Sequence, residues 1–151
     1  MTEPTHVKDT TGPDIALCAH ATLRRAMRVI SQSYDAALKP AGLKATQFTV
    51  LAVIAGRDPM PMTRLAEILV MDRTTLTRNL KPLVAKGWTE IGRERDERVR
   101  LVSATGAGKA VVAEAIPLWR QAQGQVERRL GADRLSALLG GLRALTEDPR
   151  G

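Results

Sequence analysis

The first forty residues change from a polar segment to a helical pattern of apolar positions. Residues 1–12 carry no hydrophobic periodicity, so we expect a disordered N-terminal tail there. The stretch Gly12-Pro13-Asp14 is a helix-start signal, and apolar residues then recur at helical spacing until Lys39-Pro40 interrupts them. The residues of this stripe are Ile15, Leu23, Met27, Ile30, Tyr34 and Leu38. The pattern predicts one long helix over residues 13–40.

Two shorter helices are predicted next. Residues 46–55 are apolar nearly all round, which is typical of a helix packed on several sides, and a stretch containing Gly56 and Pro59 ends it. Pro61 opens the second helix. Its apolar stripe is Leu65, Ile68 and Leu69. We therefore expect the first of these helices at the centre of the core, while the second has one apolar face.

A third helix in this region has one apolar and one basic face. Asp72 is its predicted N-cap and Gly87 its left-handed C-cap, which gives a helix over about residues 73–86. The residues predicted to face inward are Leu76, Leu80, Leu83 and Val84. Pro82 removes one backbone hydrogen bond, so we expect a kinked or loosened last turn.

The last third of the chain predicts a small sheet followed by long helices. Residues 88–92 and 99–103 have the composition of two strands, joined by a charged loop over residues 93–98, and no other segment predicts a strand. Thr105 then caps a long helix. Its stripe is Val112, Ile116, Trp119, Val126 and Leu130, and a final helix carries Leu135, Leu138, Leu139, Leu142 and Leu145. The pattern thus predicts helix over most of residues 104–147.

The order of these elements predicts the architecture. A short helix, a tight turn, a second helix with a basic face and a charged hairpin are the order of a winged helix-turn-helix, here over residues 43–103. The fold class is mainly α, with a small β-hairpin wing and long N- and C-terminal helices. The helical segments over 13–40 and 104–147 have no second layer within the chain apart from the small winged unit, so we expect helices of another copy to cover them. The sequence therefore predicts a homodimer.

Charge and composition narrow the class of partner. The 151 residues carry a formal charge of +7 with a pI near 10.3, which favours nucleic acid as a partner and an anionic membrane second, although solubility alone also explains such a charge. No apolar run approaches the roughly 18 residues of a membrane span, so we expect no membrane partner. The single cysteine, Cys18, fits a reducing compartment, and we expect a cytoplasmic location.

The sequence shows no catalytic or metal-binding constellation. One cysteine and two histidines form no metal-ligand set at helical spacing, and no acid–base cluster is visible. The stretch Gly106-Ala107-Gly108-Lys109 fails the phosphate-loop pattern, because Ser103 stands at its first glycine and Ala110 follows the lysine. We therefore expect no enzymatic activity, no metal and no cofactor.

The basic face of the helix over residues 73–86 suits a DNA major groove. Arginine can reach guanine O6 and N7 with two bonds, and threonine can contact a thymine methyl group or a phosphate. The residues assigned to contact with double-stranded DNA are Thr63, Arg64, Arg73, Thr74, Thr75, Thr77, Arg78, Lys81, Arg95 and Arg98. An ordinary solvated face is the alternative interpretation of these charges.

Several motifs together resemble the MarR family of transcriptional regulators, over the chain from about Leu17 to Leu145. They are Pro61-Met62-Thr63-Arg64-Leu65-Ala66-Glu67-Ile68-Leu69, Met71-Asp72-Arg73-Thr74-Thr75-Leu76-Thr77-Arg78, Gly87-Trp88 and Arg95-Asp96-Glu97-Arg98-Val99-Arg100-Leu101-Val102. The resemblance implies an obligate homodimer with interlocking terminal helices and two winged motifs on a palindromic operator. It also implies that Arg98 is the wing-tip arginine that enters the minor groove and that Asp96 braces the wing. The chain departs from the family pattern at Glu97 and Ala104.

A polar stripe on the first helix is a candidate effector site. His20, Arg24 and Arg28 follow one another at i, i+4 and i+8 and could hold the carboxylate of a small molecule, such as the aromatic acids held in relatives. The residues assigned to this pocket are His20, Arg24, Met27, Arg28, Tyr34 and Phe48. Plain exposure, or pairing with acids of a partner chain, is the alternative.

Cys18 lies close to the place where some MarR-like regulators sense peroxide, and Tyr34 falls where those sensors carry a tyrosine. The cysteine is displaced by about two residues, roughly 200° round a helix, and Ala45 stands where they have another tyrosine. A small thiol buried in the core is the favoured interpretation.

Three functions follow from these features. The first is a dimeric DNA-binding transcriptional regulator, a repressor that a small-molecule effector releases from a palindromic operator. The second is a nonspecific DNA-coating protein, which the acids Glu94, Asp96 and Glu97 of the wing disfavour. The third is a redox-sensing regulator that acts through Cys18.

Overall fold

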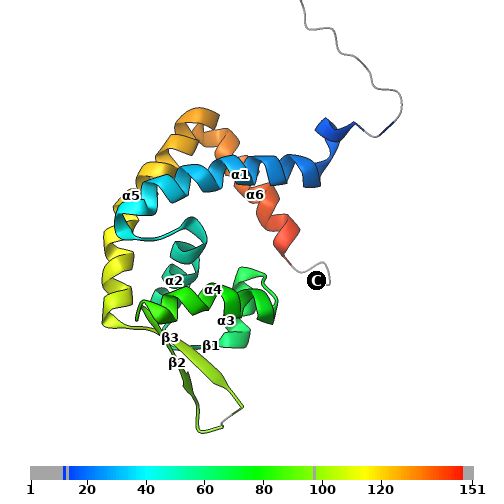
Figure 1. Ribbon diagram of the computed structural model, residues 1–151. Coiled ribbons are helices and arrows are strands. Elements are labelled where there is room, and N and C mark those ends of the chain that lie inside the picture. The colour runs from blue at the N-terminus through cyan, green and yellow to red at the C-terminus, as the bar shows by residue number, and fades with distance from the viewer. Residues whose placement is uncertain (1–11, 13, 97, 148–151) are drawn as a thin grey trace, which may run out of the picture.

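The computed structural model describes residues 12, 14–96 and 98–147, which form a mainly helical fold with a small antiparallel sheet. The predicted fold class is confirmed. Apart from Gly12, the tail predicted over residues 1–12 lies outside the described residues, and so do Pro13 and Glu97. Figure 1 shows two parts: long helices at one end of the molecule, and a smaller lobe whose β-hairpin projects at the other.

The helical end consists of α1 (Ala19–Leu38), α5 (Gly106–Leu130) and α6 (Ala132–Thr146). The prediction of one continuous first helix from residue 13 was wrong, because a 3₁₀ turn (η1, Ile15–Leu17) precedes α1 and Cys18 separates the two. Asp14 caps the turn through the backbone N–H of Ala16, and Cys18 is extended, with ψ of 111°. An extended residue cannot continue a helix, so the apolar stripe starts with a bend.

The smaller lobe contains α2 (Ala45–Gly56), α3 (Met62–Leu69) and α4 (Arg73–Ala85), and a second 3₁₀ turn (η2, Lys39–Ala41) connects it to α1. Its sheet has the order β1-β3-β2, formed by Met60–Pro61, Arg100–Ala104 and Thr89–Arg93. The prediction of a two-stranded sheet therefore missed β1. Met60 pairs with Val102, and both are buried, but two residues are too few for a period-2 signal in the sequence.

The core lies where α2, α3, α4 and the sheet meet the end of α1 and the first half of α5. Leu76, Leu80 and Leu83 are at most 1% exposed, which confirms their predicted inward orientation. Val84 is 40% exposed, so its predicted inward orientation was wrong. It follows Leu83 by about 100° round the helix, beyond the edge of the face that the lobe covers.

The turn between α3 and α4 and the end of α4 are set by local backbone geometry. Val70 is left-handed (φ 51°), and the N–H of Met71 donates to the carbonyl of Ala66, which ends α3. Gly87 has φ of 70°, which confirms the predicted left-handed cap, and the N–H of Trp88 donates to the carbonyl of Leu83. The chain therefore leaves α4 directly into β2.

The buried face of α5 consists of small residues. The buried residues are Gly108, Val111, Ala115 and Ala122, whereas the predicted stripe of Val112, Ile116, Trp119 and Val126 is half-buried and Leu130 is 36% exposed. Small side chains let neighbouring elements approach the α5 backbone, so the larger ones flank that contact. Phe48 stacks on Trp119 at a centroid distance of 6.3 Å and thereby joins α2 to α5.

Much of α6 is uncovered. Leu135 is its buried residue, while Leu138, Leu139 and Leu145 are 42%, 37% and 71% exposed. In the part of the chain that the structure describes, no helix is both long and apolar enough to cross a membrane.

Candidate nucleic-acid interface

Asp72 fixes the start of α4. Its carboxylate accepts the backbone N–H of Thr75 at 2.7 Å and the Thr75 hydroxyl at 2.9 Å. The hydrogen bond from the Thr75 N–H, followed by that from the hydroxyl, lowers the pKa of the Asp72 carboxyl from its ordinary value of 3.8. The first turn of α4 is therefore held by an ionised cap.

The exposed face of α4 presents most of the residues predicted for the major groove. Arg73, Thr74, Thr77, Arg78 and Lys81 are all exposed. The Thr77 hydroxyl donates to the carbonyl of Arg73 at 2.9 Å, which fixes its rotamer.

Thr75 differs from its predicted place. It is half-buried, and its hydroxyl is bound to the Asp72 cap rather than turned outward. An N3 residue of a capped helix faces back toward its cap, so the side chain that follows Thr74 in the sequence does not share its exposed face.

Thr63 and Arg64 lie exposed in the first turn of α3. Arg64 forms an ion pair with Glu67 at 3.0 Å, with both side chains about two-thirds exposed. Exposed pairs of this kind contribute little to stability, so Glu67 does not hold Arg64 tightly.

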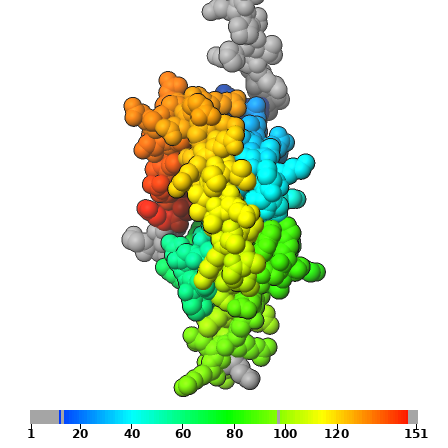
Figure 2. All heavy atoms as spheres, turned by 90° about the vertical axis from the view of Figure 1, so that its left-hand side faces the viewer, coloured from blue at the N-terminus to red at the C-terminus, as the bar shows by residue number. Residues whose placement is uncertain are grey.

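The wing is a short hairpin that projects from the lobe at the end remote from α1 and α6, as Figures 1 and 2 both show. Arg95 and Arg98 are exposed near its tip. The Asp96 carboxylate accepts the backbone N–H of Arg98 at 3.2 Å, and the Asp96 carbonyl accepts the N–H of Val99 at 3.0 Å. Asp96 thus closes the turn that carries Arg98.

A hollow of about 270 Å³ lies between α3, α4 and β3. It is lined by Met62, Thr63, Ala66, Arg73, Leu76, Thr77, Arg98, Val99 and Arg100. Arg100 is a lining residue with no role predicted from the sequence, although it follows the wing tip at an exposed position. No pattern in the neighbouring sequence indicates that Arg100 faces α3 and α4.

The six residues predicted for an effector pocket do not come together. His20, Arg24, Met27 and Arg28 are exposed along α1, while Phe48 is 8% exposed in the core. The Tyr34 hydroxyl is hydrogen-bonded to Gln123 of α5, and burial raises its pKa above 10.0, so it stays protonated at neutral pH. The single chain therefore does not gather these six residues into one pocket, and the effector assignment stays a prediction.

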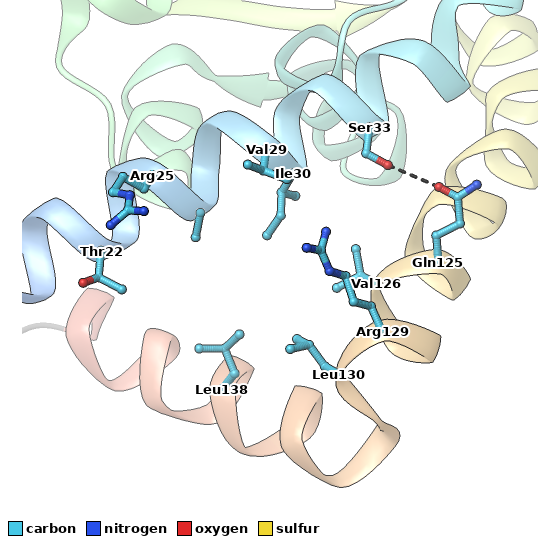
Figure 3. Close-up of a pocket in the computed structure, with 11 residues that line it drawn as sticks. Thr22, Arg25, Val29, Ile30, Ser33, Gln125, Val126, Arg129, Leu130 and Leu138 are labelled. Carbon is cyan, nitrogen blue, oxygen red and sulfur yellow. Dashed lines mark hydrogen bonds between the residues drawn. The ribbon is translucent and has the colours of Figure 1, made fainter. Parts of the chain in front are cut away.

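A larger cavity, of about 620 Å³, lies on the opposite face of α1, roughly 180° from the predicted stripe. It is lined by Thr22, Arg25, Ala26, Val29, Ile30 and Ser33 of α1, by Gln125, Val126, Arg129 and Leu130 of α5, and by Leu138 of α6. Figure 3 shows these side chains around the space between the three helices, with Arg129 reaching into it. The Ser33 hydroxyl donates to Gln125 at 3.2 Å at one end of the cavity. The lining residues of α1 follow one another at i, i+3 and i+4, from Thr22 to Ser33, so helical spacing in the sequence could have indicated this face.

Cys18 is not the buried core thiol that the sequence favoured. It is half-buried at the N-cap of α1, where its sulfur accepts the backbone N–H of Ala21 at 3.5 Å. Among the described residues, no group of three His, Cys, Asp or Glu side chains could hold a metal ion.

Known proteins with the same arrangement identify the family. A family model described as the MarR family matches residues 41–98, which contain α2, α3, α4 and the hairpin tip. The multiple antibiotic resistance protein MarR of Escherichia coli is 32% identical over 122 residues, which cover 77% of this chain and 85% of that protein. The chain belongs to the MarR family.

Two further MarR-like proteins extend the comparison. The crystal structure of the M. tuberculosis transcriptional regulator MosR in complex with DNA is 38% identical, with a TM-score of 0.73 over 87% of this chain and 99% of that chain. The HTH-type transcriptional regulator YwoH of Bacillus subtilis is 29% identical over 83 residues, and this chain spans 61% of its length. These relatives are transcriptional regulators and not enzymes, which agrees with the prediction for this MarR-family chain.

Proposed function

We propose that this MarR-family protein is a homodimeric, cytoplasmic transcriptional repressor that binds a palindromic DNA operator and releases it when a small molecule binds. The observation that carries the proposal is the exposed basic face of α4, held by the Asp72 cap beside the projecting wing. A helix presented in this way fits a major groove, and the wing can reach the adjacent minor groove. The relative MosR has been crystallised with DNA, which supports the same partner here.

Dimerisation is supported by apolar side chains that the chain leaves uncovered. Ile15 and Leu17 are 57% and 84% exposed at the start of the helical end, and Leu138 and Leu145 of α6 are 42% and 71% exposed. Large apolar groups gathered on terminal helices are typical of an interface between copies. Two copies related by a two-fold axis would place two α4 helices on successive major grooves, roughly 34 to 36 Å apart.

The effector part of the proposal rests on the cavity between α1, α5 and α6. Its volume of about 620 Å³ lies within the range of small-molecule sites, and its walls are mainly aliphatic with two arginines, Arg25 and Arg129. An acid with an apolar, for example aromatic, body fits this lining. Since the cavity is built from the helices that we propose to dimerise, a ligand there would change the spacing of the two α4 helices.

The test is a fluorescence-anisotropy titration against the DNA upstream of the protein's own gene and a scrambled duplex of equal length, at two salt concentrations. We expect a preference of about 10³-fold or more for the native duplex. Arg78→Ala should weaken binding to the native duplex more than to the scrambled one, whereas Arg120→Ala, an exposed arginine of α5, should change neither. Equal, steeply salt-sensitive binding of both duplexes would instead favour a nonspecific coat.

The same assay tests release. Aromatic acids should lower the affinity of the wild-type protein for the operator, and Arg129→Ala should reduce this effect. Peroxide added to wild-type protein and to Cys18→Ala tests the redox alternative, which requires release from the wild type alone.

A further inference from the structure

The hollow between α3, α4 and the wing gathers positive charge from separate elements. Arg73 comes from α4, Arg100 from the first position of β3, and Arg98 from the tip of the wing. The hydroxyl-bearing residues Thr63 and Thr77 also line it, and the remaining lining is apolar. The Thr77 hydroxyl donates to the carbonyl of Arg73, so the arginines and the Thr63 hydroxyl are the groups that can bind an anionic oxygen group here, over an apolar floor.

None of the described residues that line this hollow carries a carboxylate. Among the residues that the structure describes, the ion pairs are Arg64–Glu67 and Asp58–Lys109, so none of the three arginines is neutralised in one. Arg100 also stands directly opposite Arg93 in the β2–β3 pairing, and like charges at opposite positions destabilise a hairpin. An anion bound at the hollow would relieve this repulsion.

The start of α3 strengthens the anionic preference. Pro61 is the N-cap of α3 and provides no side-chain acceptor for the first N–H groups of the helix. Met62 and Thr63, the first two helical residues, line the hollow. The partial positive charge at the N-terminus of α3 therefore adds to the charge of the arginines that line the hollow.

The position of the hollow indicates which anion it holds. In duplex DNA, one sugar–phosphate strand separates each major groove from the adjacent minor groove. If α4 enters the major groove and the wing reaches the minor groove, that strand passes between them, and the hollow lies between α4 and the wing.

We propose that the hollow is the seat of one phosphate of the DNA backbone, bound by Arg73 and Arg100, with Arg98 at its outer rim. The proposal rests on the proposed function and adds Arg100, which binds a phosphate rather than a base. By holding the strand between two grooves, the seat fixes the register of α4 and the wing relative to each other. It stabilises binding to operator and to random DNA alike.

The test compares wild type, Arg100→Ala, Arg100→Lys and the control Arg120→Ala in salt-dependent DNA titrations. Arg100→Ala should weaken binding about tenfold for operator and scrambled duplex alike, and the slope of log K against log salt should become shallower by about one. Arg100→Lys should keep the slope, because it keeps the charge, and Arg120→Ala should match wild type. An unchanged slope for Arg100→Ala, or a loss confined to the operator, would overturn the phosphate seat.

A scan with neutral methylphosphonates, placed one at a time in the operator, identifies the phosphate. At one position per half-site the substitution should weaken wild type but leave Arg100→Ala without a further loss. Equal losses for both proteins at every position would contradict the proposal. Wild type that binds no duplex at all would instead refute the proposed function, so the two failures are distinguishable.

Discussion

At the residue scale, one carboxylate organises the α4 surface. Asp72 accepts both the N–H and the hydroxyl of Thr75, so it holds the first turn and takes Thr75 off the exposed face. Arg73 and Thr74, which flank the cap, stay exposed. The Asp72 cap thus decides which of several neighbouring polar side chains lie on the exposed face of α4.

The lowered pKa of Asp72 makes this contribution pH-dependent. Because the folded pKa lies below the ordinary 3.8, the stabilisation is fully present above that value and is lost as the pH falls through the folded pKa. At pH 7, Asp72→Ala should lower the urea midpoint by about half a molar unit. The difference from wild type should shrink as the pH falls below 3.8 and through the folded pKa, because the carboxylate then becomes protonated.

Asp72→Asn is the matched control, because it keeps a side-chain acceptor without the charge. Its unfolding midpoint should lie between those of wild type and Asp72→Ala at pH 7. A constant difference between wild type and Asp72→Ala over the whole pH range would contradict the assigned cap.

At the element scale, the first turn of α5 fixes the long helices to the smaller lobe. The Thr105 hydroxyl donates to the carbonyl of Gly87 at 2.6 Å and accepts the N–H of Gly108 at 3.0 Å. Lys109 pairs with Asp58 at 2.8 Å, in the loop after α2. This junction connects the helical end to α4, because Gly87 directly follows Lys86, the C-cap of α4.

Gly108 is the tightest point of the junction. A Cβ at this position would collide with the backbone carbonyl of Trp88, which cannot move aside as a flexible side chain can. Gly108→Ala should therefore destabilise the protein by roughly 3 kcal/mol. Gly106→Ala, two residues earlier with open space around its Cβ, should have a far smaller effect in the same urea unfolding measurement. Equal stabilities of the two variants would refute the close contact.

At the scale of the whole molecule, the helical end and the projecting wing lie at opposite ends (Figure 1). The proposed association through the helical end would therefore leave the α4 faces free for DNA. We expect the two ends to be separable in function: substitutions at one should change the oligomeric state, and substitutions at the other should change DNA contact.

A charge on the uncovered apolar surface should separate the copies. In the double variant Leu17→Glu with Leu145→Glu, we expect the mass of one chain, 16.4 kDa, by light scattering. Operator affinity should fall by about 10² or more, because each half-site is then bound by an independent molecule.

Val70→Glu is the control for the dimer test, since Val70 is 68% exposed but lies on the turn between α3 and α4. It should retain the mass of wild type. A dimeric mass for the double variant would place the interface elsewhere.

Local signals in the sequence determined most of the secondary structure of this protein and the inward face of α4. The order of helices and hairpin, the Asp72 and Gly87 caps, and the inward Leu76, Leu80 and Leu83 all follow from patterns within one element. Each depends on neighbours within a few residues along the chain, so periodicity and cap chemistry were sufficient.

Tertiary packing alone decided the rest. Met60 becomes a strand residue only because β3 lies beside it, and Arg100 lines a hollow only because α3 and α4 face that edge of the wing. The polar stripe at His20 and the cavity at Arg25 occupy opposite faces of α1, and only the placement of α5 and α6 shows which face is hollowed. These features depend on contacts between distant segments, and helical spacing gives the faces of a helix without stating what covers them.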